Sequence, residues 1–387
     1  MSLITETAAL YDEINEWEPI LPLYHSTSNA QIQVTIFSDG TFSHAEVVDA
    51  DDAKTIIPVT EDSSSRSSGI APHPLCDKLI YISGDYSTYV AKAKSNADEY
   101  FVTYIKALKA WAESEYSDIC ITAIYDYLSK RMLINDLIGD GILKLKDAVL
   151  DEEYQITKSV KQIDSFVRFV VNDLDSGENI KVWKSKVLFD KYISYYESLG
   201  KKRDCQLCYA SGKIVPVTYK HMARIRNSGD SAKLISSNDE SNFTYRGRFA
   251  NREEAFAVGE IVSQKAHLAL RWLIKTGGIS VGDEKYVAWE SCLNEIPNVF
   301  GRIVLDASEN SGSFVKDKDD KVYAKTAEQY KNIIEMAIKG YKKNLDLNSS
   351  KVILISFIPL IYFLQFRHFC GYFLNKFFYA LWQTFIF

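Results

Sequence analysis

Apolar side chains recur every three or four positions in several stretches of the chain, a spacing that places them on one face of a helix. The stretches with this pattern are residues 7–17, 101–111, 117–132 and 186–200. Ser185 can accept a hydrogen bond from the first turn of the last one, and Gly200 can end it in a left-handed conformation. We expect the apolar faces of these helices to form core.

Alternating apolar and polar residues predict two β-hairpins. In the first, residues 32–37 and 41–48 flank a turn that contains Asp39 and Gly40. In the second, residues 165–171 and 180–183 flank a polar turn. Together, these elements predict a multidomain α+β fold built from antiparallel hairpins and amphipathic helices, with no doubly wound sheet.

Two capping sequences predict longer helices in the second half of the chain. Asn251 and Glu254 form a capping box, and the helix they open would end before Gly277. Thr326 with Gln329 would open another helix in the same way. The apolar run at residues 351–356 predicts a buried strand.

A chain of 387 residues can form two or three domains with sizeable cores. We place an N-terminal α+β region at residues 1–160, a central α+β region at 161–356 and an aberrant apolar tail at 357–387. The six cysteines are mostly scattered, and the N-terminus has neither the basic nor the apolar segment of a signal peptide. We therefore expect a cytoplasmic protein.

Positive charge is concentrated in one part of an acidic chain. Between Lys201 and Lys275 there are 14 Lys or Arg residues against 7 Asp or Glu residues, a local charge of +7. The whole chain carries a net charge of -6, so the remainder carries -13. Such segregation favours a polyanionic partner, and we predict a basic nucleic-acid-facing block at residues 201–290. The alternative is a solvated helix face with clustered charge.

The sequence shows no catalytic or metal-binding signature. Cys205 and Cys208 have a spacing that suits zinc, but only His221 lies nearby as a further ligand, and structural zinc needs four. The histidines are dispersed, and no glycine-rich phosphate cradle precedes a helix. We predict a protein that is not an enzyme and that binds neither a metal nor a cofactor.

Two blocks of the sequence carry a resemblance to a known family. The first contains Arg66-Ser67-Ser68-Gly69-Ile70-Ala71-Pro72, followed by Leu75, Cys76, Asp77 and Tyr81. The second begins at Cys205 and continues through residues 214–217, His221, residues 232–238, residues 243–245 and residues 282–289. In order and spacing, these blocks resemble the large subunit of the type I-C CRISPR Cascade effector complex, over roughly residues 4–356 of this chain.

The resemblance implies a DNA-binding subunit in antiviral defence. Such a subunit senses the protospacer-adjacent motif (PAM) on duplex DNA and helps to separate the strands, while the guide RNA reads the sequence by base pairing. The implied partners are target DNA, crRNA, the other backbone and small subunits of Cascade, and a helicase-nuclease that acts in trans. RNA binding and PAM recognition are therefore expected of the complex.

The first block would form a DNA-sensing loop at residues 61–78. This segment is rich in serine, contains Gly69 and has prolines just beyond it, so an irregular loop is expected. The candidate contacts are Arg66, Ser67, Ser68, Gly69, His73 and Lys78. Glycine lets the backbone approach bases closely, and arginine can meet a phosphate or a guanine edge. The alternative is a simple connector.

The second block supplies candidates for contacts to the nucleic-acid backbone and for base stacking. They are Arg224, Arg226, Lys233, Ser237, Asn238, Tyr245, Arg246 and Arg248. The cations can follow phosphates, and the tyrosine can stack on an unpaired base. Tyrosine also buries a large area in protein cores, so a core position for Tyr245 is the alternative.

The C-terminal tail departs from the family pattern after Ser356. We expect residues 357–387 to be the product of a frame shift or of a truncated gene. A membrane hairpin is the alternative, although Pro359 and Arg367 interrupt the apolar runs before they reach the roughly 20 residues that a spanning helix needs. Two functional alternatives therefore remain, a membrane-tethered sensor that uses this tail and a CRISPR RNA-processing ribonuclease.

Overall fold

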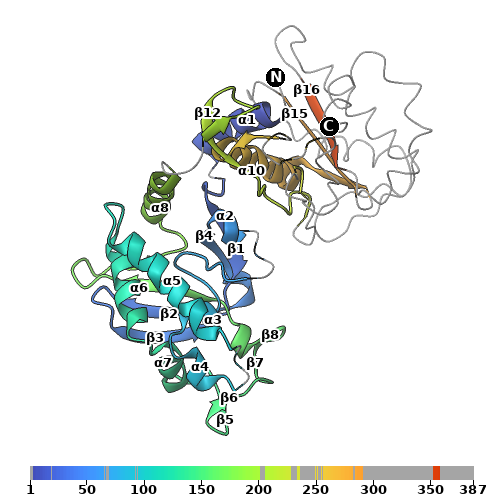
Figure 1. The fold of residues 1–387 in the computed structure, drawn as a ribbon. Helices are drawn as coiled ribbons and strands as arrows, with labels where there is room; N and C mark the ends of the chain where they lie inside the picture. The colour runs from blue at the N-terminus through green and yellow to red at the C-terminus, as the bar shows by residue number, and fades with distance from the viewer. Residues whose placement is uncertain are drawn as a thin grey trace, which may run out of the picture. The chain divides into compact units, whose positions relative to one another are not determined.

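The chain divides into two compact units in the computed structural model shown in Figure 1. The structure describes residues 3–18, 20–64, 66, 69–91, 93, 95–200, 205–227, 233–235, 249, 251, 254, 256–281, 284–290 and 352–357. Leu21–Asp204 form one unit, here called the central unit. Met1–Ile20 and Cys205–Phe387 form the other, here called the terminal unit.

A four-stranded sheet organises the central unit, with strand order β10-β9-β2-β3. The strands are β2 (Ile32–Phe37), β3 (Phe42–Val47), β9 (Val167–Asn172) and β10 (Asn179–Lys181). The antiparallel pairs β2–β3 and β9–β10 confirm the two predicted hairpins. The two hairpins are joined by a parallel pairing of β2 with β9, which places Val34 beside Phe169. This sheet joins residues on both sides of residue 160, where the sequence analysis places a domain boundary.

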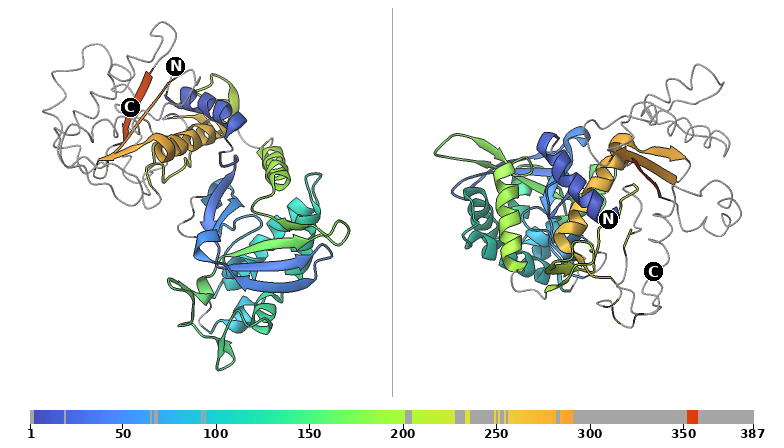
Figure 2. Two further views of the ribbon diagram at one scale, coloured as in Figure 1. Left: turned by 180° about the vertical axis from the view of Figure 1, so that it is seen from behind. Right: turned by 90° about the horizontal axis from the view of Figure 1, so that it is seen from above.

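Helices cover one face of this sheet, as Figure 2 shows from behind. The helices of the unit before residue 140 are α2 (Glu61–Ser64), α3 (Leu79–Ile82), α4 (Tyr86–Tyr89), α5 (Ala97–Ala112), α6 (Ile119–Ser129) and α7 (Leu133–Gly139). The predicted helices around residues 101–111 and 117–132 are confirmed as α5 and α6. Tyr104 and Trp111 of α5 are buried in the same core as Val34 and Phe169. The apolar stripe read from the sequence therefore faces the sheet.

A buried cation lies on strand β9. Arg168 is 2% exposed, and its guanidinium donates to the Asp52 carboxylate at 2.6 Å and to the Gln33 side chain at 2.9 Å. The same group lies 3.8 Å from the ring centroid of Trp183. A charge taken out of water requires partners of this kind, so the network satisfies Arg168 inside the fold.

The remaining elements of the central unit surround this layer. They are β1 (His25–Asn29), η1 (Ala50–Asp52), β4 (Lys54–Pro58), β5 (Leu145–Lys146), β6 (Val149–Leu150), β7 (Gln155–Thr157), β8 (Val160–Lys161), η2 (Gln162–Asp164) and α8 (Lys186–Gly200). Helix α8 begins where the sequence predicts, and the Leu188 amide donates to the Ser185 hydroxyl at 3.4 Å. The prediction that Gly200 ends this helix in a left-handed conformation is wrong. Gly200 is the last helical residue, and its φ is not positive.

In the terminal unit, helix α1 (Leu3–Trp17) packs against helix α10 (Glu260–Gly277). The described strands are β11 (Cys205–Leu207), β12 (Ile214–Thr218), β13 (Val258–Gly259), β14 (Ile279–Val281), β15 (Glu284–Glu290) and β16 (Val352–Phe357). Strand β16 confirms the strand predicted at residues 351–356, and it pairs with β15. Helix α1 confirms the predicted N-terminal helix.

The start predicted for helix α10 is wrong. The capping box at Asn251 would begin the helix there, but α10 begins at Glu260. Val258 and Gly259 pair with strand β12, and backbone used in a sheet cannot also form the first turns of a helix. The Asn251 amide lies 3.5 Å from the Glu254 carboxylate, and Glu254 is helical, so the contact expected of the capping box forms ahead of α10.

Two predicted features lie outside the described residues, namely the helix opened by Thr326 and nearly all of the tail at 357–387. Across the ranges that the structure describes, no helix has the length and apolar character to cross a membrane.

Candidate nucleic-acid interface

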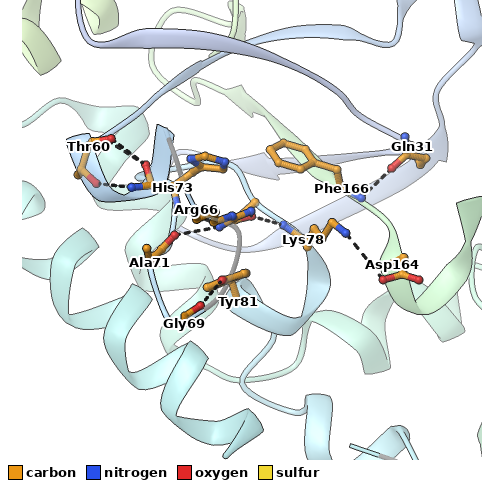
Figure 3. Close-up of polar contacts among 12 residues, drawn as sticks. Gln31, Thr60, Arg66, Gly69, Ala71, His73, Lys78, Tyr81, Asp164 and Phe166 are labelled. Carbon is orange, nitrogen blue, oxygen red and sulfur yellow. Dashed lines mark hydrogen bonds and ion pairs between the residues drawn. The ribbon is translucent and has the colours of Figure 1, made fainter. Parts of the chain in front are cut away.

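The predicted DNA-sensing loop leaves strand β4 and returns to the core at helix α3 (Figure 3). Its first turn is fixed by two reciprocal hydrogen bonds. The Thr60 amide donates to the Ser63 hydroxyl at 2.9 Å, and the Ser63 amide donates to the Thr60 hydroxyl at 3.1 Å. These bonds form the short helix α2 from a serine-rich sequence that favours turns.

Asp77 is the central group of this loop. Its side chain is fully buried, and it pairs with the Arg66 guanidinium through two bonds of 2.6 Å. The backbone amides of His73 and Lys78 each donate to the same carboxylate at 2.7 Å. A bidentate arginine and two backbone donors satisfy a buried carboxylate well. Asp77 therefore ties three separate points of the loop together.

Arg66 makes further contacts within the loop besides its ion pair with Asp77. Its guanidinium also donates to the Ala71 carbonyl at 3.0 Å and stacks over the Tyr81 ring, 4.3 Å from the centroid. Burial alone would lower the pKa of Arg66, but the hydrogen bonds and charge of Asp77 raise it, so the group stays charged. The DNA contact expected of Arg66 stays a prediction, and the structure gives the residue an internal role besides.

The end of the loop is attached to strand β9 and helix α5. The Val167 amide donates to the Asp77 carbonyl, and the Leu79 amide donates to the Ser165 carbonyl, both at 3.0 Å. The buried Tyr104 hydroxyl donates to the Leu75 carbonyl at 2.9 Å. Leu75 has a φ of 82°, a left-handed conformation that such contacts must hold in place. The loop is thus built into the core.

The remaining predicted contact residues differ in exposure. Gly69 is exposed, has a φ of 84° and has no atom within 4 Å of the position a Cβ would take. The Lys78 side chain is 46% exposed, and its ammonium lies 3.8 Å from the Asp164 carboxylate. His73 is half-buried. Ser67 and Ser68 lie outside the described residues.

A second group of cations gathers in the terminal unit, where residues 221–226 lie along helix α10. His221 Nδ1 lies 2.8 Å from the Ser263 hydroxyl, and Arg271 donates to the Met222 sulfur at 3.7 Å. An isolated bridge pairs Ala223 with Lys233. These contacts bring part of the predicted basic block together.

The predicted contact residues of this block differ in exposure, and several of them lie outside the described residues. Arg224 is exposed, whereas Arg226 and Lys233 are half-buried. Ser237, Asn238, Tyr245, Arg246 and Arg248 lie outside the described residues, and the predictions for them stay predictions.

Two neutral histidines lie beneath the cations. His267 Nδ1 is 2.6 Å from the Ser263 carbonyl, which can only accept, so this nitrogen carries a proton. Burial lowers the pKa of both rings, to about 3 for His221. Their Nε2 atoms are buried without a hydrogen-bond partner in the described structure. Ser263 is buried between the rings, so its contact with His221 offers no accessible nucleophile.

The cysteine pair is split between surface and core. Cys205 is exposed, whereas Cys208 is buried and its sulfur accepts from the amides of Gly259 at 3.1 Å and Ser211 at 3.3 Å. Burial would raise the pKa of Cys208, but these hydrogen bonds outweigh it and lower the pKa. Within the described ranges, no three His, Cys, Asp or Glu side chains are grouped so that they could hold a metal ion.

Sequence reasoning gave no role to Asp77, Tyr81 or Arg271. Asp77 and Tyr81 belong to a recognisable block, but a buried ion pair eleven residues apart in an irregular loop leaves no periodic signal. Arg271 could have been found, because Ser263, His267 and Arg271 recur every four residues and therefore share one face of the predicted helix.

Comparison with known protein families identifies this chain's family. The family model described as "CRISPR-associated protein (Cas_Csd1)" matches residues 8–357. No curated protein matches the chain.

Proposed function

Since this chain belongs to the Cas_Csd1 family of CRISPR-associated proteins, we propose that it is the subunit of an RNA-guided interference complex that senses the PAM on target DNA. Family membership supports a role in a CRISPR effector complex of the Cascade kind. Binding of DNA, reading of the motif and assistance in strand separation are the finer parts of the proposal. We assign the chain no catalytic step of its own.

The observation that carries the proposal is the fixed loop around Asp77. A surface that reads a short motif must hold its contacts in one geometry before DNA arrives, because ordering a flexible loop costs binding free energy. Here a buried carboxylate, a bidentate arginine and two backbone amides hold the loop. Gly69 and Lys78 are exposed on this support.

The two exposed positions suit different parts of duplex DNA. Lys78 can neutralise a phosphate, since its pairing with Asp164 is long and exposed and therefore weak. Gly69 has no side chain to keep a base edge away, and its surroundings are open. Base pairing with crRNA would then read the remaining sequence, and cleavage would fall to a helicase-nuclease in trans. The other partners are the backbone and small subunits, in the cytoplasm.

A binding titration of the assembled complex tests the proposal. We expect the complex with crRNA to bind a matched duplex more tightly when one particular flanking motif is present. Lys78→Ala should weaken binding to every sequence by a similar factor, and the slope of log affinity against log salt should fall by about one. Lys109→Ala is the matched control, because Lys109 is an exposed lysine of the same unit with a similar ion pair to Glu113.

Two results would count against the proposal. Equal affinity for duplexes with every flanking motif would remove motif sensing. An effect of Lys109→Ala as large as that of Lys78→Ala would mean that general charge, and not the loop, determines binding.

A further inference from the structure

Helix α10 presents a polar line toward the segment at residues 221–226. Ser263, His267 and Arg271 lie four residues apart and therefore on one face of the helix. Ser263 contacts His221 and Arg271 contacts Met222, so the segment lies against this face of the helix. Arg224 lies two residues after Met222 and is exposed.

Arg224 and Arg271 have no carboxylate partner in the part of the chain that the structure describes. Lys265 of the same helix provides a contrast, because its ammonium contacts both carboxylate oxygens of Asp12, at 2.7 and 2.9 Å. Arg271 is half-buried, and among the described residues it donates a weak hydrogen bond to the thioether sulfur of Met222. Burial and the charge of Arg224 together lower the pKa of Arg271. The two guanidinium groups thus repel each other.

The buried histidines of this region bring no negative charge to the pair. Burial lowers the pKa of both His221 and His267, so both rings are neutral. Arg224 has a φ of 61°, which is unfavourable for a residue with a side chain. Residues held in this way commonly mark sites where a ligand is bound.

We infer that Arg224 and Arg271 together bind one phosphate group of a target DNA strand. A phosphodiester carries one negative charge and several acceptor oxygens, and two guanidinium groups can donate to it from two directions. The repulsion between the arginines is relieved when the anion lies between them. This inference rests on the proposed function, and it adds Arg271, which the sequence did not indicate.

Salt-dependent filter binding of the assembled complex to a matched duplex tests the inference. Arg224→Ala with Arg271→Ala should weaken target binding about tenfold or more, because charge-assisted hydrogen bonds are lost. The slope of log affinity against log salt should fall by about one in the double variant, as for one phosphate, and not by about two. Each single variant should already show most of the affinity loss, since both side chains hold the same group.

Lys265→Ala is the control, because it removes one positive charge from the same helix where Asp12 already balances it. Arg224→Ala alone keeps the test valid if the half-buried Arg271 proves necessary for folding, since Arg224 is exposed and alanine adds no new backbone strain.

An unchanged slope and affinity in Arg224→Ala would overturn the inference while leaving motif sensing intact. Loss of crRNA from the variant complex, large enough to account for the weaker target binding, would overturn the assignment to DNA. Failure of the unaltered complex to bind DNA would instead reject the proposed function.

Discussion

Asp77→Ala is expected to lower the free energy of unfolding of the central unit by about 3–5 kcal/mol, the cost of breaking a buried ion pair by removing one partner. The substitution leaves the Arg66 guanidinium, whose side chain is 17% exposed, without its counter-charge. It also removes the acceptor for the amides of His73 and Lys78. An unsatisfied buried donor costs about 1–3 kcal/mol, so the expected loss lies at the high end for a single substitution.

Hydrogen exchange of the amides in α5 and α6 measures this loss in the full chain, because these helices report on the central unit alone. Arg66→Met combined with Asp77→Ala should cost less than the sum of the single changes, since the double variant has no uncompensated charge. Asp164→Asn is the control, because its side chain is 61% exposed and its bond to Lys78 is long. Additive effects in the double variant would show that the ion pair does not hold the loop.

The sequence predicted the elements that depend on local pattern. The hairpin at residues 32–48 and the helix at residues 101–111 each follow from a short periodic run, and both form as expected. The parallel pairing of β2 with β9 joins strands more than 130 residues apart, and the sequence of neither strand indicates which strand it pairs with. The start of α10 was missed because Val258 and Gly259 pair with β12, so a helix opened at Asn251 cannot continue through them into α10.

The candidate site could be located from the sequence, but its internal organisation could not. The block around Arg66 and Gly69 was recognisable, and the exposed glycine has the left-handed backbone that favours its residue type. The inward use of Arg66 depends on the burial of Asp77, which no property of an isolated aspartate reveals. Charge counting likewise found Arg224, but it could not show that the charge of Arg224 acts on Arg271 of helix α10.

Acid is expected to destabilise the central unit through two histidines that are neutral in the fold. The pKa of His25 is lowered to about 4 by burial, against an opposing hydrogen bond to the Leu23 carbonyl. The pKa of His73 is also lowered to about 4, by burial first and by Arg66, while Asp77 acts in the opposite direction. In the unfolded chain both groups titrate near 6.5.

The sign of the effect follows from proton binding. Between about pH 6.5 and 4 the unfolded chain binds protons that the folded chain does not, so the stability that both histidines contribute above pH 6.5 is lost as the pH falls. Each histidine contributes at most about 1.4 kcal/mol per pH unit, and about half of that at pH 6.5, where the unfolded imidazole is half protonated. From pH 6.5 to pH 5 the two together should lower the free energy of unfolding by about 3 kcal/mol.

Denaturant unfolding at a series of pH values, followed by hydrogen exchange in the central unit, tests this prediction. The variant His25→Asn with His73→Asn should lose about 3 kcal/mol less between pH 6.5 and 5, because asparagine does not titrate and can still donate to Leu23. His44→Asn is the control, since His44 lies at the surface of β3. Asp85 works in the opposite direction, because burial raises its pKa, but every variant retains it and the comparison cancels its effect. Parallel curves of unfolding free energy against pH for the unaltered chain and the double variant would contradict the prediction. They would mean that water or a negative charge stabilises the protonated imidazoles in the fold, so that any acid sensitivity arises from other groups.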